Sequence, residues 1–142
     1  MPKVSMFVYA EGSQINVNPQ GEQQILIINP QLVFTPMFVP GQFSFSINLG
    51  IMEIDLDVEH VVRLIFWGPN DKTKSLADTA DTVRIPIQKD NPKKLPPDMR
   101  GLMLNMDFKN VILAENGTYL TEVYIDNVKF EEFPIKVKGQ NS

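Results

Sequence analysis

Cysteine is absent from this 142-residue sequence, and histidine occurs once, as His60. The absence of cysteine excludes disulfide frameworks, thiolate metal sites and cysteine nucleophiles. A single histidine excludes a multi-histidine zinc site within one subunit, and it makes any serine–histidine–aspartate triad depend on His60 alone. Long hydrophobic runs are also missing. Nowhere do about 18 apolar residues follow one another, so the sequence predicts no membrane-spanning helix.

Positive charge is in deficit as well. The chain has 13 basic and 17 acidic residues and a formal net charge of −4, whereas a nucleic-acid-binding domain normally carries a basic face. The first ten residues contain only a short apolar stretch followed by Glu11, which is unlike a secretory signal. We therefore expect a cytoplasmic protein without nucleic-acid or membrane partners. A chain of this length can fold as one domain, residues 1–142, without a metal or another cofactor.

Alternation of large apolar and small polar residues dominates the sequence, and helical periodicity is nearly absent. The clearest example is the segment FSFSINL, residues 43–49, in which every large side chain falls at an odd-numbered position. Because successive strand residues point to opposite faces, this spacing predicts a strand with one buried face. The apolar phase shifts by one residue after Gly50, which predicts a β-bulge or a strand corner there.

Six further segments have strand-like patterns. Pro30 and Pro86 each interrupt one of them, and because a proline cannot donate to a central ladder, both indicate edge strands. Asp126 and Asn127 tolerate the positive φ of a tight turn and predict a hairpin. The six segments are residues 24–34, 61–67, 83–87, 102–108, 119–125 and 128–137. Together these patterns predict a single antiparallel β-sandwich of about eight or nine strands, immunoglobulin-like in general form.

The run LAENGTY, residues 113–119, supports the sandwich. An apolar residue, a polar turn and then Gly117-Thr118-Tyr119 resemble the tyrosine corner of immunoglobulin-like domains, in which the phenol hydroxyl bonds to the backbone of the turn. We therefore expect Tyr119 and Gly117 to be structural. Trp67 is the candidate for the core tryptophan of such a domain, although it stands at the end of its segment beside Gly68.

Four carboxylates alternate with apolar residues in one segment. They are Glu53, Asp55, Asp57 and Glu59. On a strand they would share one face, and hard cations take several oxygen ligands, so a divalent-cation or carbohydrate module is one hypothesis. Same-face neighbours on a strand lie about 6.6 Å apart, however, and no EF-hand loop is present. The sequence favours a solvated strand face whose charge protects an edge.

His60 follows that acidic segment and shares, by parity, the face of its apolar residues. A general base needs a nucleophile or a polarised substrate beside it, and the surrounding DVEHVVRL contains no recognisable catalytic motif. We therefore expect a hydrogen-bonded structural histidine in a protein that is not an enzyme. Catalysis by His60 with a nearby carboxylate is the alternative.

Two loops are candidate partner-binding surfaces. The segment VFTPMFVPG, residues 33–41, has two prolines and no alternation, so Phe34, Met37 and Phe38 are either buried beneath the sandwich or exposed for a partner. The loop of residues 88–100 has three prolines and gathers positive charge, which favours contact with an anion or a protein. A solvated loop is the alternative. The candidate contact residues of this second loop are Lys93, Lys94 and Arg100.

Several strand and turn features occur together along the chain. They are Tyr9-Ala10, residues 24–34, Gly117-x-Tyr119, Ile125-Asp126-Asn127 and Phe133-Pro134-Ile135-x-Val137. In these features the chain resembles small all-β bacterial and prophage proteins that are catalogued as a domain of unknown function. The resemblance implies a sandwich fold and a phage or prophage setting, and it supplies no catalytic residues. We expect a non-enzymatic protein-binding or assembly module whose partner is another protein or a second copy of the chain.

Overall fold

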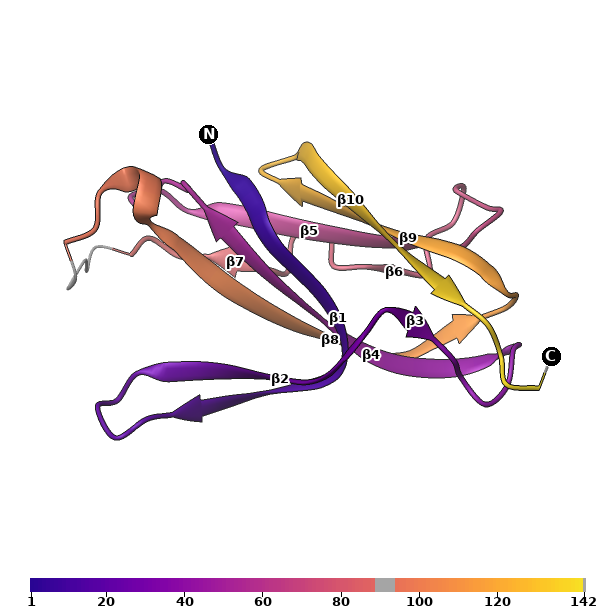
Figure 1. Ribbon diagram of the computed structural model, residues 1–142. Helices are drawn as coiled ribbons and strands as arrows, with labels where there is room; N and C mark the ends of the chain where they lie inside the picture. The colour runs from indigo at the N-terminus through magenta and orange to yellow at the C-terminus, as the bar shows by residue number, and fades with distance from the viewer. Residues whose placement is uncertain (89–93, 142) are drawn as a thin grey trace.

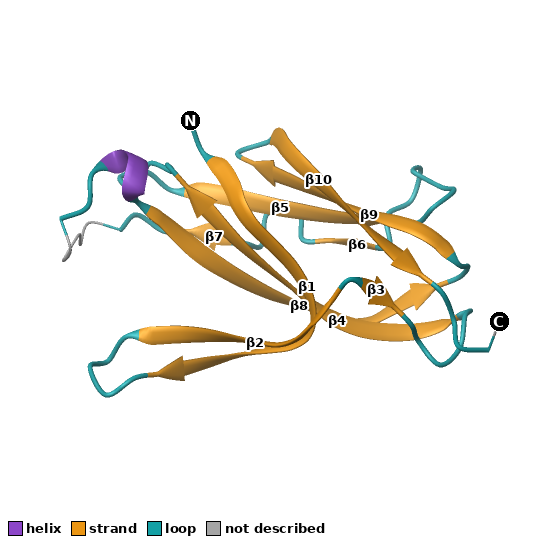
Figure 2. Cartoon of the chain, viewed as in Figure 1, coloured by secondary structure: helices purple, strands orange, loops and turns teal. Residues whose placement is uncertain are grey.

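The computed structural model describes residues 1–88 and 94–141. It is built from two β-sheets packed face to face (Figure 1), and nearly all of its regular structure is strand (Figure 2). Helix in the described residues is limited to one 3₁₀ turn, η1, at Pro97–Met99. No helix in this part of the chain is long and apolar enough to cross a membrane.

The first sheet has four strands in the order β2-β1-β4-β8. Their bounds are Gln23–Gln31 for β2, Lys3–Val17 for β1, Gly41–Met52 for β4 and Gly101–Leu113 for β8. The second sheet has the order β3-β10-β9-β5-β6, and β7 pairs with β5 outside that path. Their bounds are Val33–Phe34 for β3, Val128–Val137 for β10, Gly117–Ile125 for β9, His60–Trp67 for β5, Ala77–Asp78 for β6 and Arg84–Ile85 for β7.

The predicted all-β sandwich is confirmed, and its immunoglobulin-like form stays a prediction. Ten strands are described instead of eight or nine, because the predicted segment 24–34 divides into β2 and β3 and the two-residue strand β6 leaves no alternating pattern. The described pairs are antiparallel except β3 with β10, which run parallel. Pro30 lies in β2 at one edge of its sheet, and Pro86 directly follows β7, which pairs only with β5. Both prolines therefore stand where a missing donor costs no central ladder bond.

The core lies between the two sheets and follows the alternation of the sequence. Odd-numbered residues of β4 from Phe45 to Ile51 are buried and face even-numbered residues of β5, such as Leu64 and Phe66. Phe45 is central, with its ring 5.2 Å from that of Phe66 and 5.4 Å from that of Phe108 on β8. Burial of these apolar surfaces is the main stabilising contribution to the fold.

The predicted phase shift at Gly50 is placed wrongly. β4 runs through Gly50 to Met52 without changing phase, and the irregularity opposite Gly50 lies in β1, between Val4 and Met6. The shift occurs at Glu53, which has a φ of +59° and donates its N–H to the carbonyl of Arg100 at 2.8 Å. A residue with that backbone leaves the ladder, so the strand ends before the acidic segment begins.

The hairpin predicted at Asp126 and Asn127 is confirmed. β9 and β10 are joined there, and the two residues have φ values of +51° and +68°. Positive φ at both central positions is the geometry that two-residue hairpin turns favour, and Asp and Asn tolerate it better than most residues.

One strand serves two partners in succession. β1 pairs with β4 from Lys3 to Ala10 and with β2 from Tyr9 to Val17. Beyond Ala10 the β1–β2 ribbon leaves the sandwich and projects from it, at the lower left of Figure 1. We call residues 11–31, the projecting part of this hairpin with its turn, the arm.

Candidate functional site

Exposed apolar side chains gather in one stretch of the chain. About half of the large hydrophobic residues that the described structure leaves exposed fall between residues 15 and 38. They are Ile15, Val17, Leu26, Ile28, Leu32, Val33, Met37 and Phe38. Scattered surface hydrophobics need no explanation, but a concentration of them marks an interaction surface. The first four belong to the arm, which makes the arm the leading candidate site.

Both faces of the arm carry apolar residues, as the strand register shows. Ile15 stands directly opposite Ile25, and residues opposite each other in a sheet share a face. Leu26 and Ile28 point to the other face, where they oppose Gln14 and Gly12. A half-buried sheet would be polar on its solvent side. The arm has no polar side of this kind.

The turn of the arm is well formed. The Oδ1 of Asn18 accepts hydrogen bonds from the N–H groups of Gln20 and Glu22, at 3.0 and 2.9 Å. The N–H of Gly21, which has a φ of +81°, donates to the carbonyl of Asn18. Asn at the start of a turn and Gly at the positive-φ position are the residues that such a turn requires. The arm is therefore a defined hairpin and not an irregular loop.

The base of the arm is fixed to both sheets. Tyr9, where β1 changes partner, donates its hydroxyl to the carbonyl of Phe133 at 2.7 Å and lies 2.7 Å from Oγ1 of Thr121. Burial raises the pKa of the Tyr9 hydroxyl, and the hydrogen bond to Thr121 opposes that rise only in part. Just beyond the bend, Asn105 of β8 donates to Oγ of Ser13 at 3.1 Å. These contacts set the direction in which the arm leaves the body.

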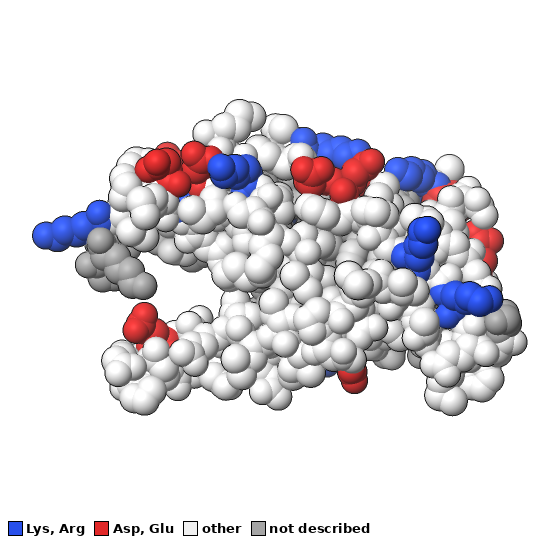
Figure 3. Space-filling view, in the orientation of Figure 1, with Lys and Arg blue, Asp and Glu red and all other residues white. Residues whose placement is uncertain are grey.

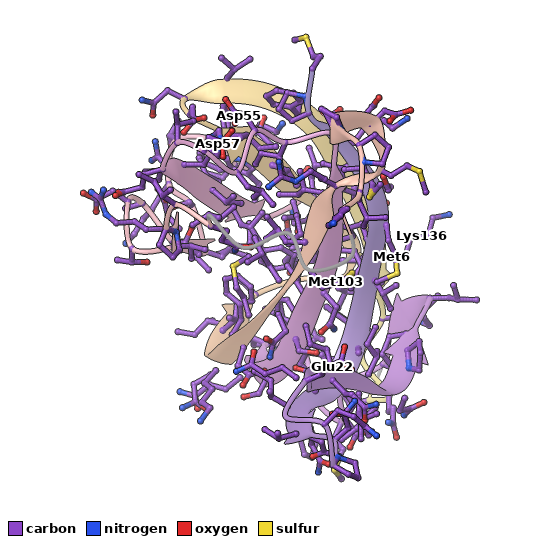
Figure 4. All side chains as sticks on the ribbon, turned by 90° about the vertical axis from the view of Figure 1, so that its left-hand side faces the viewer. Met6, Glu22, Asp55, Asp57, Met103 and Lys136 are labelled. Atoms are coloured by element: carbon purple, nitrogen blue, oxygen red, sulfur yellow. The ribbon has the colours of Figure 1, made fainter. Side chains whose placement is uncertain are left out.

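A notch separates the arm from the body of the sandwich. Figure 3 shows it at the left of the molecule, and in that view the arm has almost no charged surface apart from an acidic residue near its tip. Figure 4 looks toward the tip, with Glu22 below and Met6 and Met103 above it on the first sheet. Met103 is 40% exposed. The notch therefore has apolar residues on the body side as well as on the arm.

The predicted apolar loop is only partly a surface. Phe34 is fully buried and packs against Phe43 and Phe45, with ring centres 4.8 and 4.9 Å away, so it belongs to the core and cannot contact a partner. Met37 and Phe38 are 68% and 61% exposed, as a contact surface requires. The prediction of Phe34 as a contact residue was therefore wrong, and contact through Met37 and Phe38 stays a prediction.

The predicted basic loop lies far from that surface. Lys93 is outside the described residues, Lys94 is exposed and Arg100 is half-buried at the end of η1. Figure 1 places residues 94–100 at the left end of the molecule and the loop before β4 at the right end, near the C-terminus. The two predicted surfaces therefore do not form one interface.

The acidic segment is not a strand face. Residues 53–59 form the connection between β4 and β5, so the carboxylates do not stand in a row. Glu53 pairs with Lys3 at 3.2 Å, Glu59 pairs with Arg84 at 2.8 Å, and Oδ1 of Asp55 accepts the N–H of Asp57 at 2.9 Å. Within residues 1–88 and 94–141, no three acidic or histidine side chains come together as a metal site. The prediction of a carboxylate stripe on one strand was wrong.

His60 is held by two internal acceptors. Its Nδ1 lies 2.6 Å from Oδ2 of Asp126, and its Nε2 contacts the carbonyl of Asp55. Burial by itself lowers the pKa of His60, but these two acceptors and their negative charge outweigh it and raise the pKa above its usual value. The opposite holds for Asp126: burial would raise its pKa, and the hydrogen bonds from His60 and the N–H of Val61 lower it.

This arrangement gives His60 a structural position, with an acceptor at each ring nitrogen. Because both partners are acceptors, both ring nitrogens donate when the imidazole is protonated, and neither is free to take a proton from a substrate. The side chain is buried and lines none of the described surface clefts. It joins the β4–β5 connection to the β9–β10 turn.

The predicted tyrosine corner is present. Tyr119 is 1% exposed, and its hydroxyl donates to the carbonyl of Glu115 at 2.6 Å. Gly117 has a φ of +147°, and a side chain there would approach the ring of Pro69 to about 3.0 Å. Trp67 is not a core tryptophan. It is half-buried at the end of β5 and donates its Nε1–H to Oε1 of Glu122 at 2.5 Å.

A second depression opens between the edges of the two sheets. It has a volume of about 650 Å³ and lies between the β5–β6 connection and the end of β8. Its lining mixes apolar residues such as Leu76 and Ile112 with Lys74 and Glu115. Glu115 is engaged by the side-chain amide of Asn70 at 2.7 Å. This depression gathers no set of catalytic or metal-binding groups.

Sequence reasoning missed the arm. The sequence indicates an opening strand that ends at Tyr9-Ala10, but β1 continues to Val17, beyond the part that pairs with β4. Four consecutive apolar residues from Ile25 to Ile28 were a usable signal, because two faces cannot both be apolar on a strand that is covered on one side.

No protein-family model matches the chain, and no curated protein matches it. The resemblance to prophage proteins therefore stays a prediction.

Proposed function

We propose that the chain is a non-enzymatic protein-binding or assembly module of the cytoplasm and that the arm is its main contact surface. One observation carries the proposal: the arm is a defined hairpin with exposed apolar residues on both faces, and among the described strands β2 pairs with β1 alone. The isolated chain gains no stability from apolar side chains exposed to water, here Ile15, Val17, Leu26 and Ile28. A partner that covers them removes that apolar surface from water, which is favourable.

The anchoring of the arm supports the same proposal. Tyr9 and Ser13 fix its base, and Asn18 organises its turn. A hairpin that is ordered before binding loses less conformational entropy when a partner covers it. Such preorganisation is useful for a binding element and has no evident use in a solvent-exposed spacer.

Met37 and Phe38 provide a second contact surface in this proposal. They are exposed at the opposite end of the molecule from residues 94–100. A module with contacts at two ends can join neighbours on either side, which suits a structural assembly such as the phage or prophage setting that the resemblance implies. A single partner that wraps one face would instead leave one of the two ends unused.

Affinity capture with matched variants tests the proposal. The tagged chain, the arm variant Ile15→Ser/Leu26→Ser and the control Ile112→Ser are used to capture proteins from the native host. Ile112 is 59% exposed on β8, so the control removes a comparable exposed side chain elsewhere. We expect a stoichiometric protein, or the chain itself, to be captured by the wild type and the control and lost from the arm variant.

Two checks make the outcome decisive. Thermal unfolding must give the same midpoint for all three proteins, because exposed side chains contribute little to stability. If the arm variant keeps every partner that the wild type captures, the arm is not the contact surface. If Met37→Ser/Phe38→Ser alone loses the partner, the contact lies at the other end of the molecule.

A further inference from the structure

The free edges of the two sheets are not alike. β3, β6 and β7 are two-residue strands, too short to recruit another chain, and the part of β10 that β3 leaves free carries charged residues, a bulge and Pro134. β8 is long, but it carries Asp107 and Lys109 and has an extra residue at its bulge, where Asn110 has a φ of +56°. Short strands, charges and bulges are the usual means of protecting an edge from pairing.

β2 has almost none of these protections. It is nine residues long and contains no charged residue, and its single proline, Pro30, and its one positive-φ residue, Asn29 (φ +52°), both lie within its last three positions. On the side away from β1, alternate N–H and C=O groups of an edge strand point outward without a partner strand. Leu26 and Ile28, at its middle, are 43% and 41% exposed. An uncharged, apolar and long edge is a template for another strand.

The molecule exposes more surface than a compact chain of its mass. A compact chain of this mass is expected to expose about 7,400 Å². The chain exposes 8734 Å², which is roughly 1,300 Å² more than that expectation. A stable protein interface takes about 800 Å² from each partner. The surplus surface, to which the projecting arm contributes, is therefore large enough to supply one side of such an interface.

We infer that the partner of β2 is β2 of a second copy of this chain, paired antiparallel about a two-fold axis near Ile27. This inference rests on the proposed function and names the partner for the arm. Two identical strands in antiparallel order are related by a two-fold axis, as closed dimers require. The pairing places Leu26 of each copy opposite Ile28 of the other, and two four-stranded sheets become one of eight strands.

The arm carries little charge that would oppose a second copy. The chain carries a net charge of −4, and its arm has only two charged residues, Glu11 and Glu22. Glu11 is held by the side-chain amide of Asn29 at 2.9 Å, and Glu22 lies at the tip. Two copies of β2 therefore meet without opposed like charges along the paired strands. A foreign peptide would find no charge pattern on the arm to select it.

Mass measurement of the full chain is the first test. Sedimentation velocity over a series of rising concentrations should show a species of twice the 16.1 kDa monomer mass. Leu26→Lys/Ile28→Lys should convert that species to monomer, because like charges would then stand opposite each other across the two-fold axis. The control Ile112→Lys adds a lysine to the edge strand β8 and should leave the dimer intact. Circular dichroism and thermal unfolding verify that both variants fold.

The absence of cysteine allows a second, independent test. Single cysteines at positions 25 to 29 are the only thiols in their proteins, so any disulfide that forms joins two copies. We expect Ile27→Cys to cross-link most rapidly, with a decline on both sides of it, and Ile112→Cys to cross-link slowly. Pairing about Ile27 requires the cross-linking rate to be highest at that position, because only a residue on the two-fold axis lies directly opposite the same residue of the other copy.

The outcomes distinguish this inference from the proposed function. A wild-type chain that is monomeric at every concentration overturns the second copy as the partner, as does a dimer that survives Leu26→Lys/Ile28→Lys. If such a monomer still captures another protein through Ile15 and Leu26, the proposed function stands and the occupant is a foreign strand. If arm variants change neither mass nor capture, both proposals are wrong.

Discussion

The hydroxyl of Tyr9 donates to the backbone carbonyl of Phe133 at 2.7 Å, so that β1 of one sheet is hydrogen-bonded to β10 of the other. Tyr9 is 5% exposed and stands where β1 passes from β4 to β2. The same bond therefore links the two layers of the sandwich and holds the base of the arm. The Tyr9 ring also packs against the rings of Phe7 and Phe34, whose centres lie 5.0 and 5.6 Å away.

Removing the Tyr9 hydroxyl is expected to destabilise the fold. Tyr9→Phe keeps the ring but leaves the Phe133 carbonyl and the Thr121 hydroxyl without this partner. The free energy of unfolding should fall by about 1–3 kcal/mol, the usual cost of an unsatisfied buried group. Urea denaturation measures the change. Tyr124→Phe is the control, because no hydrogen bond joins the Tyr124 hydroxyl to a described residue; equal losses in both variants would contradict the assignment.

Two phenylalanines of the same segment should respond in opposite ways to truncation. Phe34→Ala removes a fully buried ring and should lower the free energy of unfolding by about 3–5 kcal/mol. Phe38→Ala removes a ring that is 61% exposed and should change stability by less than about 0.5 kcal/mol. Chemical denaturation of the two variants side by side checks the division of this loop into core and surface. A similar cost for both would show that Phe38 is also packed.

His60 should make stability depend on pH above its unfolded pKa of about 6.5. Its pKa is raised in the folded protein, so its stabilising contribution is complete below the unfolded value of about 6.5. That contribution is lost as the pH rises through the higher folded pKa. We expect the urea midpoint to fall in this range in the wild type and to stay flatter in His60→Asn. Nuclear magnetic resonance titration of the His60 ring should show the raised pKa directly, and a value at or below about 6.5 would contradict it.

Calcium should not stabilise the protein. Glu53 and Glu59 are paired with Lys3 and Arg84, and the side chain of Asp55 accepts a backbone N–H. A ligand that binds only the folded state raises the unfolding midpoint as its concentration exceeds its dissociation constant. Thermal unfolding with and without millimolar calcium should give the same midpoint. A rise that disappears in Asp55→Asn/Asp57→Asn would establish a cation site in this segment.

The parts of the fold that could be predicted depend on chemistry within a few residues. The Asp126-Asn127 turn requires positive φ, the tyrosine corner spans four residues, and Pro30 and Pro86 cannot donate to a ladder. These features do not depend on which element packs on which. They were therefore visible in the sequence and are confirmed by the structure.

The parts that could not be predicted depend on tertiary contacts. The acidic segment alternates as a strand would, but Glu53 has a φ of +59° and ends the strand, although its N–H still bonds to the carbonyl of Arg100, 47 positions away. The arm arises because β1 bends away from β4 after Ala10. An alternating pattern records which residues share a face, and it does not record where a strand parts from its sheet.

The double use of β1 has a consequence for how the protein moves. From Lys3 to Ala10 the strand is part of a layered core, and its amide hydrogens exchange only when the sandwich opens as a whole. From Gln14 to Val17 the same strand is held by a single neighbour, so its amides exchange through fraying of the hairpin tip. One continuous strand thus contains both slow and fast amides. The border between the slow and the fast amides falls near the Tyr9 hydroxyl. Amides beyond it that exchange more slowly at high protein concentration identify the residues of the arm that a partner covers.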